Sequence, residues 1–329
     1  MPKSKLLITS SSPHVKTTKT TKQIMIDVCI ALIPAVVMGI VLFGGMAALI
    51  VALALISAIA SEFVYLLIAG KKINQIIREF DFTSCVTGLL VGLSIGVNYP
   101  WYSPVFGSMF AIIAVKMLFG GTGKNLVNPA VTGRIFIFMS FQSVVGPWVL
   151  PTISSIFGTS VETGATIMEG LTKGTLPNIS NLDLLLGTSV AGCIGETCKI
   201  ALILGGIYLA IRGIINIGYP IIYIAVTGLF TVALNNFNFE FFLPSILSGG
   251  LILGAIFMAT DYTTTPNTRL GNIIYFIALG LVTAGLRTAT GMEVVSFAIL
   301  LMNLFVPLID RFILPKPFGY KKQKKAKGE

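Results

Sequence analysis

The sequence is poor in charged residues. Only 11% of its 329 residues are Asp, Glu, Lys or Arg, whereas soluble domains carry about 25%. Hydrophobic residues make up 54% and form repeated apolar runs of about 20 residues, the length that crosses a bilayer core. This composition excludes an ordinary soluble domain and predicts an all-α polytopic membrane protein.

The scarcity of histidine and cysteine excludes several metal chemistries. His14 is the single histidine and lies in the N-terminal tail, so the chain lacks the paired histidines that hold haem across a membrane. Cysteines 29, 85, 193 and 198 form no CxxC spacing, which predicts neither a zinc site nor a disulfide framework. Isolated buried thiols are favoured over two membrane cysteines that hold iron and sulfur. No metal ligand and no catalytic nucleophile is assigned, so redox chemistry would require a bound organic cofactor.

The apolar runs predict about ten transmembrane helices, bounded by Gly, Pro or charged residues. A basic tail, 1–23, precedes the bundle 24–313, and a second basic tail, 314–329, follows it. The bundle divides into halves of about 24–150 and 194–313, separated by a loop at 151–193. The predicted spans are 24–43, 46–69, 82–98, 104–120, 132–150, 194–213, 217–235, 244–260, 271–287 and 293–313.

The distribution of basic residues predicts the orientation. With the N-terminus inside, ten spans return the C-terminus inside, and of the 23 lysines and arginines only Lys173, Lys199 and Arg287 fall outside. Cytoplasmic loops carry such an excess of Lys and Arg. We therefore expect both termini in the cytoplasm and the loop 151–193 on the outer side of the cell (inner) membrane. The net charge of +10 then reflects basic residues that mark the cytoplasmic side and contact anionic lipid, and we expect no nucleic-acid partner.

A weak internal symmetry predicts an inverted repeat of five plus five spans. Residues 87–92 lead to Pro100, and the similar glycine-rich residues 248–254 lead to Pro266 in a span of opposite direction. Inverted repeats place binding sites between the halves. Close helix packing is the alternative explanation of the individual glycines.

Two polar segments on the inner side are candidate binding segments. Residues 120–130 are glycine-rich and contain Lys124, Asn125 and Asn128, but the spacing fails the Walker A pattern. Asn128 either satisfies backbone groups freed by a helix break or binds a ligand. Residues 259–266 contain Asp261, Thr264 and Thr265, which suit a cation, a water chain or a flavin edge, or simply cap the preceding span.

Four acidic residues lie in or near the predicted spans. Asp310 is expected to pair with the adjacent Arg311, and Glu196 with Lys199 one turn later. Asp261 could similarly pair with Arg269. Asp27 and Glu62 have no local basic partner, so they are the candidates for an ion path.

The outer loop contains the most specific motif of the chain. Thr163-Gly164-Ala165-Thr166 matches the [Ser/Thr]-Gly-Ala-Thr signature of proteins that carry FMN through a phosphoester on the last threonine. Together with residues 123–130, 260–266 and 295–311, it resembles the RnfD/NqrB family over nearly the whole chain, 20–315. The length and the short basic tail look more like the D subunit of Rnf complexes than like the longer B subunit of the quinone reductase.

The resemblance implies a membrane subunit of an Rnf-type complex, inactive alone. Covalent FMN on Thr166 would relay electrons between ferredoxin and NAD, coupled to Na⁺ or H⁺ translocation. Implied partners are a flavin transferase acting outside the cytoplasm and other Rnf subunits: a second FMN-bearing subunit, two small iron-binding membrane subunits, and soluble iron–sulfur and NAD-binding subunits. Similarity to the quinone reductase also implies non-covalent riboflavin between the half-bundles.

Two other functions stay open from the sequence. The B subunit of a sodium-translocating NADH:quinone reductase would need a quinone site near the inner face and a longer N-terminal region. An ion channel or secondary transporter would explain the inverted repeat and the acidic residues Asp27 and Glu62. In that case the Thr-Gly-Ala-Thr motif would be accidental and the purified protein colourless.

Overall fold

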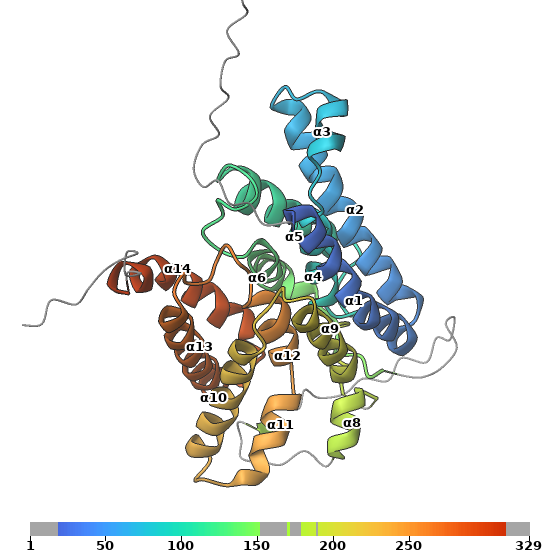
Figure 1. The fold of residues 1–329 in the computed structure, drawn as a ribbon. Coiled ribbons are helices and arrows are strands. Elements are labelled where there is room, and N and C mark those ends of the chain that lie inside the picture. Colours follow the sequence, from blue (N-terminus) through green and yellow to red (C-terminus); the bar gives the residue numbers. More distant parts are fainter. Residues whose placement is uncertain (1–18, 152–169, 172–178, 189, 314–329) are drawn as a thin grey trace, which may run out of the picture.

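A computed structural model of the protein describes residues 19–151, 170–171, 179–188 and 190–313. The regular elements of this part are helices of different lengths, packed into one bundle (Figure 1). The predicted all-α class is therefore confirmed for the described residues.

Two long helices begin the first half of the bundle. α1 (Thr21–Phe43) starts at a reciprocal cap, in which the Thr20 hydroxyl accepts from Gln23 N and the Gln23 side chain accepts from Thr20 N. Gly44, with a φ of 72°, ends α1 and leads directly into α2 (Gly45–Ile68). The half continues with α3 (Ile73–Glu79), α4 (Thr83–Leu93), α5 (Ser103–Phe110), the π-helix η1 (Ala111–Met117), α6 (Pro129–Phe141) and the 3₁₀ turn η2 (Gln142–Val144).

The second half contains more interrupted helices and ends in two long ones. The Thr268 hydroxyl accepts from Gly271 N at 3.0 Å and caps the first of these two, α13. The elements are α8 (Asn181–Leu186), α9 (Lys199–Ile211), α10 (Gly218–Leu234), η3 (Phe239–Phe241), α11 (Phe242–Leu247), α12 (Leu251–Leu253), the π-helix η4 (Gly254–Met258), α13 (Arg269–Thr290) and α14 (Val295–Phe312).

Helix lengths in the described part fit a polytopic membrane protein. Four helices, α1, α2, α13 and α14, are long and apolar enough to cross a membrane. The pair Phe239–Leu247 and Leu251–Met258 adds a fifth span if its 67° bend lies within one crossing. Other apolar helices are shorter, at Thr83–Leu93, Ser103–Met117, Lys199–Ile211 and Gly218–Leu234.

Several predicted spans are wrong in extent, and α3 was not predicted. Apolar side chains continue beyond the helix ends because neighbouring helices bury the turns that follow. Hydropathy alone does not distinguish an apolar helix from an apolar turn that is buried in this way. The helix covers Thr83–Leu93 of the predicted 82–98, begins only at Lys199 in 194–213, ends at Phe141 in 132–150, and is broken after Leu247 in 244–260.

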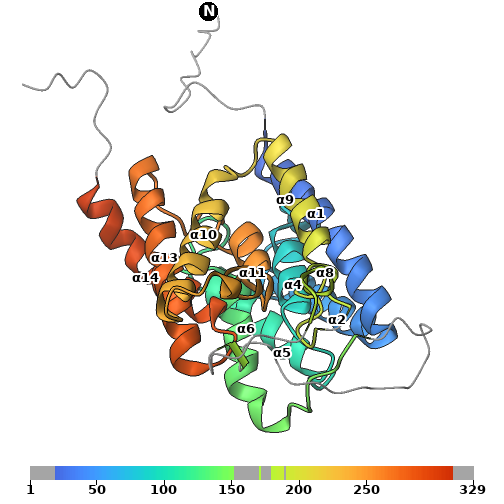
Figure 2. The same cartoon turned by 90° about the horizontal axis from the view of Figure 1, so that it is seen from below.

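The two halves have similar internal packing. α2 packs against α4 and α5, while α10 packs against α11 and α13. The halves meet where α1 lies beside α9, which is visible in Figure 2, and where α6 contacts α14. The buried core joins both halves and includes Leu32, Val91, Leu253 and Phe276.

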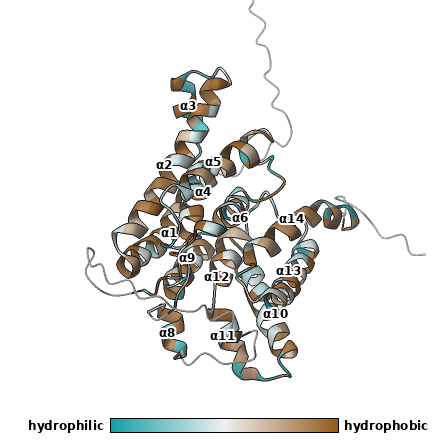
Figure 3. Ribbon diagram, turned by 180° about the vertical axis from the view of Figure 1, so that it is seen from behind, coloured by the Kyte–Doolittle hydropathy of each residue, from teal (hydrophilic) through white to brown (hydrophobic). Residues whose placement is uncertain are grey.

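The outer surface of the bundle is largely apolar. Ile56 is 63% exposed and Met139 is 70% exposed. Figure 3 shows hydrophobic residues along most helices, with hydrophilic residues mainly at helix ends and turns. Such a surface would be unfavourable in water and suits contact with lipid.

Candidate functional site

The two polar segments predicted from the sequence meet at one end of the interface between the halves. Asn125 Nδ2 donates to Thr263 Oγ1 at 3.1 Å, and Asn128 Nδ2 donates to the Met258 carbonyl at 3.0 Å. Each segment follows a π-helix, η1 in the first half and η4 in the second. The structure therefore brings together residues that lie far apart in the sequence.

Asn128 also satisfies backbone groups at a helix break, one of the two roles predicted for it. Its Oδ1 accepts from Ala130 N at 2.9 Å and from Val131 N at 3.4 Å, so it caps α6, and Pro129 occupies the first helical position. The preceding turn depends on glycines, since Gly120 and Gly121 have φ values of 107° and 91°.

Asp261 contacts hydroxyl groups of its own segment. Its Oδ2 accepts from Thr263 Oγ1 at 2.8 Å and from Thr264 Oγ1 at 3.4 Å, and Thr265 Oγ1 donates to its carbonyl at 3.0 Å. Burial raises the pKa of the Asp261 carboxyl, against the hydrogen bonds from the threonines. The described contacts include no pair with Arg269, so that prediction was wrong: the local turn occupies the carboxylate instead.

Asn303 is a further polar residue of this region that the site prediction missed. It is fully buried in α14, and its amide, oriented to satisfy its neighbours, donates to the Thr264 carbonyl at 3.2 Å and accepts from Asn128 N at 3.2 Å. It also contacts the Tyr275 hydroxyl at 2.8 Å. The sequence did offer a signal for this residue, because an asparagine in the middle of an apolar run indicates a buried polar contact.

These segments border a small pocket of about 110 Å³. Small-molecule sites are typically about 300–1,000 Å³, so the pocket in this conformation is too small for a flavin ring. The side chains of Asn125, Asn128, Asp261, Thr264 and Thr265 form hydrogen bonds with protein groups, and their assignment to a cofactor stays a prediction. The polar residues that line the pocket are Thr83, Lys116, Thr122, Asn125, Asn128, Thr260, Asp261 and Thr263.

A much larger cavity of about 860 Å³ lies elsewhere between the halves. We call it the large cavity. Its wall includes Val145 and Trp148, which precede the loop 151–193, and Val190 and Ala191, which lie near the end of that loop. Aromatic residues in its lining are Tyr99, Phe138, Trp148 and Phe297, and charged residues are Arg134, Glu196 and Glu293.

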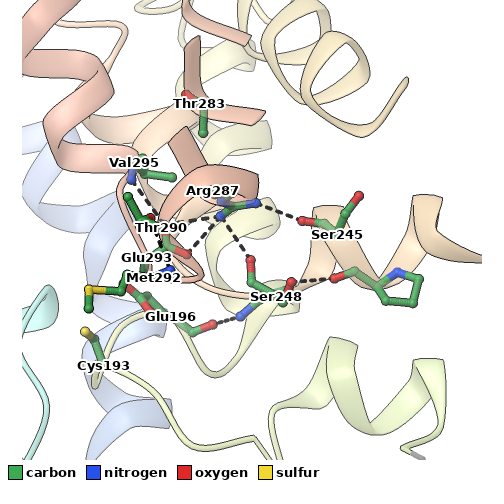
Figure 4. A network of polar contacts seen from close by, with 12 residues as sticks. Cys193, Glu196, Ser245, Ser248, Thr283, Arg287, Thr290, Met292, Glu293 and Val295 are labelled. Carbon is green, nitrogen blue, oxygen red and sulfur yellow. Dashed lines mark hydrogen bonds and ion pairs between the residues drawn. The ribbon is translucent and has the colours of Figure 1, made fainter. Parts of the chain in front are cut away.

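Two buried ion pairs stand at the charged end of the large cavity. Arg134 Nη2 of α6 lies 2.9 Å from Glu196 Oε1, a residue just before α9, so this pair joins the halves. Arg287 Nη2 lies 2.9 Å from Glu293 Oε2. Arg287 also donates to the carbonyls of Ser245 and Ser248, at 2.9 and 3.3 Å (Figure 4).

The predicted pair of Glu196 with Lys199 is corrected by this arrangement. The Lys199 ammonium donates to the main-chain carbonyl of Glu196, while the carboxylate binds Arg134. The same holds for Asp310, whose carboxylate accepts from Asn267 N at 3.0 Å and Asn267 Nδ2 at 2.7 Å rather than from Arg311. In both cases the carboxylate binds a residue that is distant in the sequence instead of the basic residue nearby.

Asp27 and Glu62 also have partners that sequence spacing did not reveal. Arg212 Nη2 lies 3.0 Å from Asp27 Oδ2, and Tyr208 donates to Asp27 Oδ1 at 2.9 Å. Lys116 Nζ of η1 lies 2.8 Å from Glu62 Oε1, and both side chains are buried. Thus neither carboxylate is an isolated charge, and their assignment to an ion path stays a prediction.

The Thr-Gly-Ala-Thr motif predicted to carry FMN lies outside the described residues. Thr163, Gly164, Ala165 and Thr166 belong to 152–169, which the described ranges leave out. Described residues on both sides of 152–169 form part of the wall of the large cavity: Val145 and Trp148 before it, and Val190 and Ala191 after it.

Comparison with known proteins places the chain in a family. The NQR2, RnfD, RnfE family model matches residues 8–319. The chain is 39% identical to the D subunit of the Na⁺-translocating ferredoxin:NAD⁺ oxidoreductase complex of Acetobacterium woodii, with 97% of each chain covered. It is 35% identical to the D subunit of the proton-translocating ferredoxin:NAD⁺ oxidoreductase complex of Clostridium ljungdahlii, over 96% of this chain and 97% of the relative. The protein therefore belongs to the NQR2, RnfD and RnfE family of membrane subunits.

Proposed function

We propose that the protein is the D-type membrane subunit of an ion-translocating ferredoxin:NAD⁺ oxidoreductase complex. The observation that carries this proposal is the end-to-end match with relatives that bear this name, including one at 39% identity over 97% of the chain. The match favours an Rnf-type complex over a quinone reductase or a separate transporter. The coupling ion stays open, because one of these relatives is named for Na⁺ and another for protons.

In this proposal the chain crosses the cell (inner) membrane about ten times, with shortened helices completing several crossings. Both termini lie in the cytoplasm and the loop 151–193 lies outside. The similar packing of α2 on α4 and α5 and of α10 on α11 and α13 supports the inverted repeat. The contacts of α1 with α9 and of α6 with α14 join corresponding helices of the two halves.

FMN attached to Thr166 would have its ring in the large cavity. The cavity is bordered by both flanks of the loop that carries Thr166, its volume of about 860 Å³ suits a small molecule, and aromatic side chains line it. In addition, the Ser296 hydroxyl is buried at this cavity without a hydrogen-bond partner in the described structure. An unsatisfied hydroxyl beside aromatic rings is what a flavin with carbonyl and ring-nitrogen groups would complete.

The protein's own residues would hold the cofactor and exclude water. FMN supplies the one-electron chemistry that the side chains lack. The tether at Thr166 would retain it in the cavity, while Tyr99, Phe138 and Phe297 provide apolar walls. Non-covalent riboflavin between the halves stays a prediction. The small pocket bordered by residues 120–130 and 259–266 would have to widen to admit it.

The partners in this proposal are the flavin transferase that modifies Thr166 and the other Rnf subunits. Those subunits would include a second FMN subunit, iron-binding membrane subunits, and soluble iron–sulfur and NAD-binding subunits. If ions pass near Asp27 or Glu62, the ion pairs of these residues with Arg212 and Lys116 must open during the cycle.

The attachment is tested by in-gel fluorescence of the denatured chain, produced with the transferase, and by mass spectrometry of its peptides. Thr166→Ala should abolish the flavin fluorescence, whereas Thr159→Ala in the same loop should keep it. FMN mass should occur on the Thr166 peptide. A dark wild-type band, or a fluorescent Thr166→Ala band, would contradict covalent attachment at this residue.

The position of the ring is tested separately with a chain that keeps Cys193 as its single cysteine, because this buried thiol lines the large cavity. Alkylation of Cys193 by a small hydrophilic maleimide should be several-fold slower with FMN attached than in the Thr166→Ala background. Equal rates would place the ring elsewhere.

A further inference from the structure

The charged end of the large cavity has a composition that the proposed function does not explain. Five charged residues gather there, three of them buried and two, Arg134 and Glu293, partly buried. We call them the charge cluster: Arg134, Glu196, Lys199, Arg287 and Glu293. They come from α6, the segment before α9, the start of α9, the end of α13 and the turn before α14. Figure 4 shows Glu196, Arg287 and Glu293 together with Cys193 around this point.

The break between α11 and α12 is shaped to admit the two carboxylates of the cluster. A Cβ on Gly250 would lie 2.5 Å from Glu196 Oε1, and a Cβ on Gly249 would overlap Glu293 Oε2. A side chain at either position would require the carboxylate to move. The consecutive glycines therefore leave room for one carboxylate each, which indicates that the ion pairs are built into the break.

The charge cluster carries an excess of positive charge. Arg134 is paired with Glu196 and Arg287 with Glu293, but Lys199 forms no ion pair among the described residues. Lys199 is only 1% exposed, and its ammonium contacts a main-chain carbonyl. Three basic groups thus face two carboxylates. A buried lysine without a carboxylate partner either loses its proton or requires an anion nearby.

The cavity side of the cluster also has an unsatisfied group. Ser296, which is 3% exposed at the start of α14, has a hydroxyl without a described hydrogen-bond partner and lines the large cavity. Arg134, with Glu196 and Glu293, supplies the charged part of the same lining. Lys199 and Arg287 lie outside this lining, so Arg134 is the basic side chain that the described lining presents to the cavity, next to the free hydroxyl of Ser296. A ligand that gains negative charge would therefore meet Arg134 first.

We propose that Arg134 and Glu196 set the reduction potential of the redox group in the large cavity, with Arg134 compensating the negative charge that arrives with an electron. This inference rests on the proposed function, because it takes the FMN of Thr166 as that group. Reduction by a one-electron iron–sulfur or flavin donor of the complex adds one negative charge, and no covalent bond forms or breaks. Arg134 and Glu196 are positioning residues for this charge.

The two residues act with opposite sign. Arg134→Gln removes a positive charge and so disfavours the reduced FMN, which shifts its midpoint potential to more negative values. Glu196→Gln removes the opposing negative charge and shifts the potential to more positive values. A unit charge a few ångströms away in a protein interior is sufficient for about a tenfold change or more in the ratio of reduced to oxidised FMN at fixed potential.

The experiment is a spectroelectrochemical titration of the full chain, produced with the flavin transferase and purified in detergent. The spectrum of the Thr166→Ala chain is subtracted, so that only the covalent FMN is followed. Arg134→Lys keeps the charge and should stay near the wild-type potential. Arg212→Gln, which opens the distant pair with Asp27, is the matched control and should not shift the potential.

A double variant guards against loss of folding. Removing one partner of a buried pair leaves an uncompensated charge, whereas Arg134→Gln with Glu196→Gln removes the pair and should restore both folding and a near wild-type potential. Opposite shifts in the two single variants support the inference. The inference fails if attached FMN keeps its potential in both, or if both shift in the same direction. Absence of FMN from the wild-type chain would instead refute the proposed function.

Discussion

Gly250→Ala is the substitution with the clearest expected effect on the fold. Gly250 has a φ of −85°, so an alanine backbone is permitted there. The added Cβ, however, would lie 2.5 Å from Glu196 Oε1 and 3.2 Å from Arg134 Nη1. Strain would therefore come from contact with the ion pair and not from the backbone.

The magnitude follows from how firmly the carboxylate is held. Glu196 is 4% exposed and its Oε1 lies 2.9 Å from Arg134, so the carboxylate can move away only by weakening the pair. Overpacking of this kind costs about 1–3 kcal/mol. The matched control is Gly285→Ala in α13, where nothing lies within 4 Å of the new Cβ. There the better helix propensity of alanine should stabilise the protein by up to about 1 kcal/mol.

The assay is thermal unfolding of the two full-length variants and the wild type in the same detergent, followed by intrinsic fluorescence. We expect the unfolding temperature to fall for Gly250→Ala and to stay unchanged or rise for Gly285→Ala. A Gly250→Ala chain as stable as the wild type would show that Glu196 is not seated against the break, and the role given to the two glycines would be wrong.

Two further predictions concern the residues around η1. Glu62→Gln or Lys116→Met alone should each lower the free energy of unfolding by about 3–5 kcal/mol, since each leaves one buried charge. The double variant should lower it clearly less. A double variant that is as unstable in thermal unfolding as either single variant would contradict a direct pair. Hydrogen bonds from Thr83 and Thr122 and the charge of Lys116 hold the pKa of Asp81 below its ordinary value, despite the opposing effect of burial. Because the folded pKa is the lower one, this contribution is present above the unfolded pKa of about 4 and is lost as the pH falls below it. The stability difference between wild type and Asp81→Asn should therefore stay constant above about pH 5 and narrow as the pH falls from about 5 to about 3, and a difference that does not change over this lower range would refute the assignment.

The sequence was sufficient for the fold class and for one part of the site. Long apolar runs identified α1, α2, α13 and α14 closely, because each run is bounded by glycine, charge or a capping residue. Residues 120–130 and 259–266 could be identified as candidate binding segments because polar groups inside an apolar chain are uncommon and usually have a role. Their direct contact, in which Asn125 donates to Thr263, was not predicted and comes from the packing of the halves.

The ion pairs could not be predicted by local spacing. Arg134 and Glu196 are 62 residues apart, and Asp27 and Arg212 are 185 apart, so only the packing of the halves brings them together. The broken helices were equally inaccessible, since Ser248, Gly249 and Gly250 interrupt a run whose hydropathy stays continuous. The charge cluster depends on both features, which explains why no sequence pattern indicated it.

The π-helices bear on how this chain can change length. A π-helix accommodates one residue more than an α-helix of the same height, so η1 and η4 each behave as an α-helix with a single insertion. Deleting one residue at the start of η1 would remove this extra residue and leave the turns on either side close to their present faces. In an ordinary α-helix the same deletion turns every later side chain by about 100°. A deletion of one residue in η1 is therefore expected to be better tolerated than one in an ordinary membrane helix.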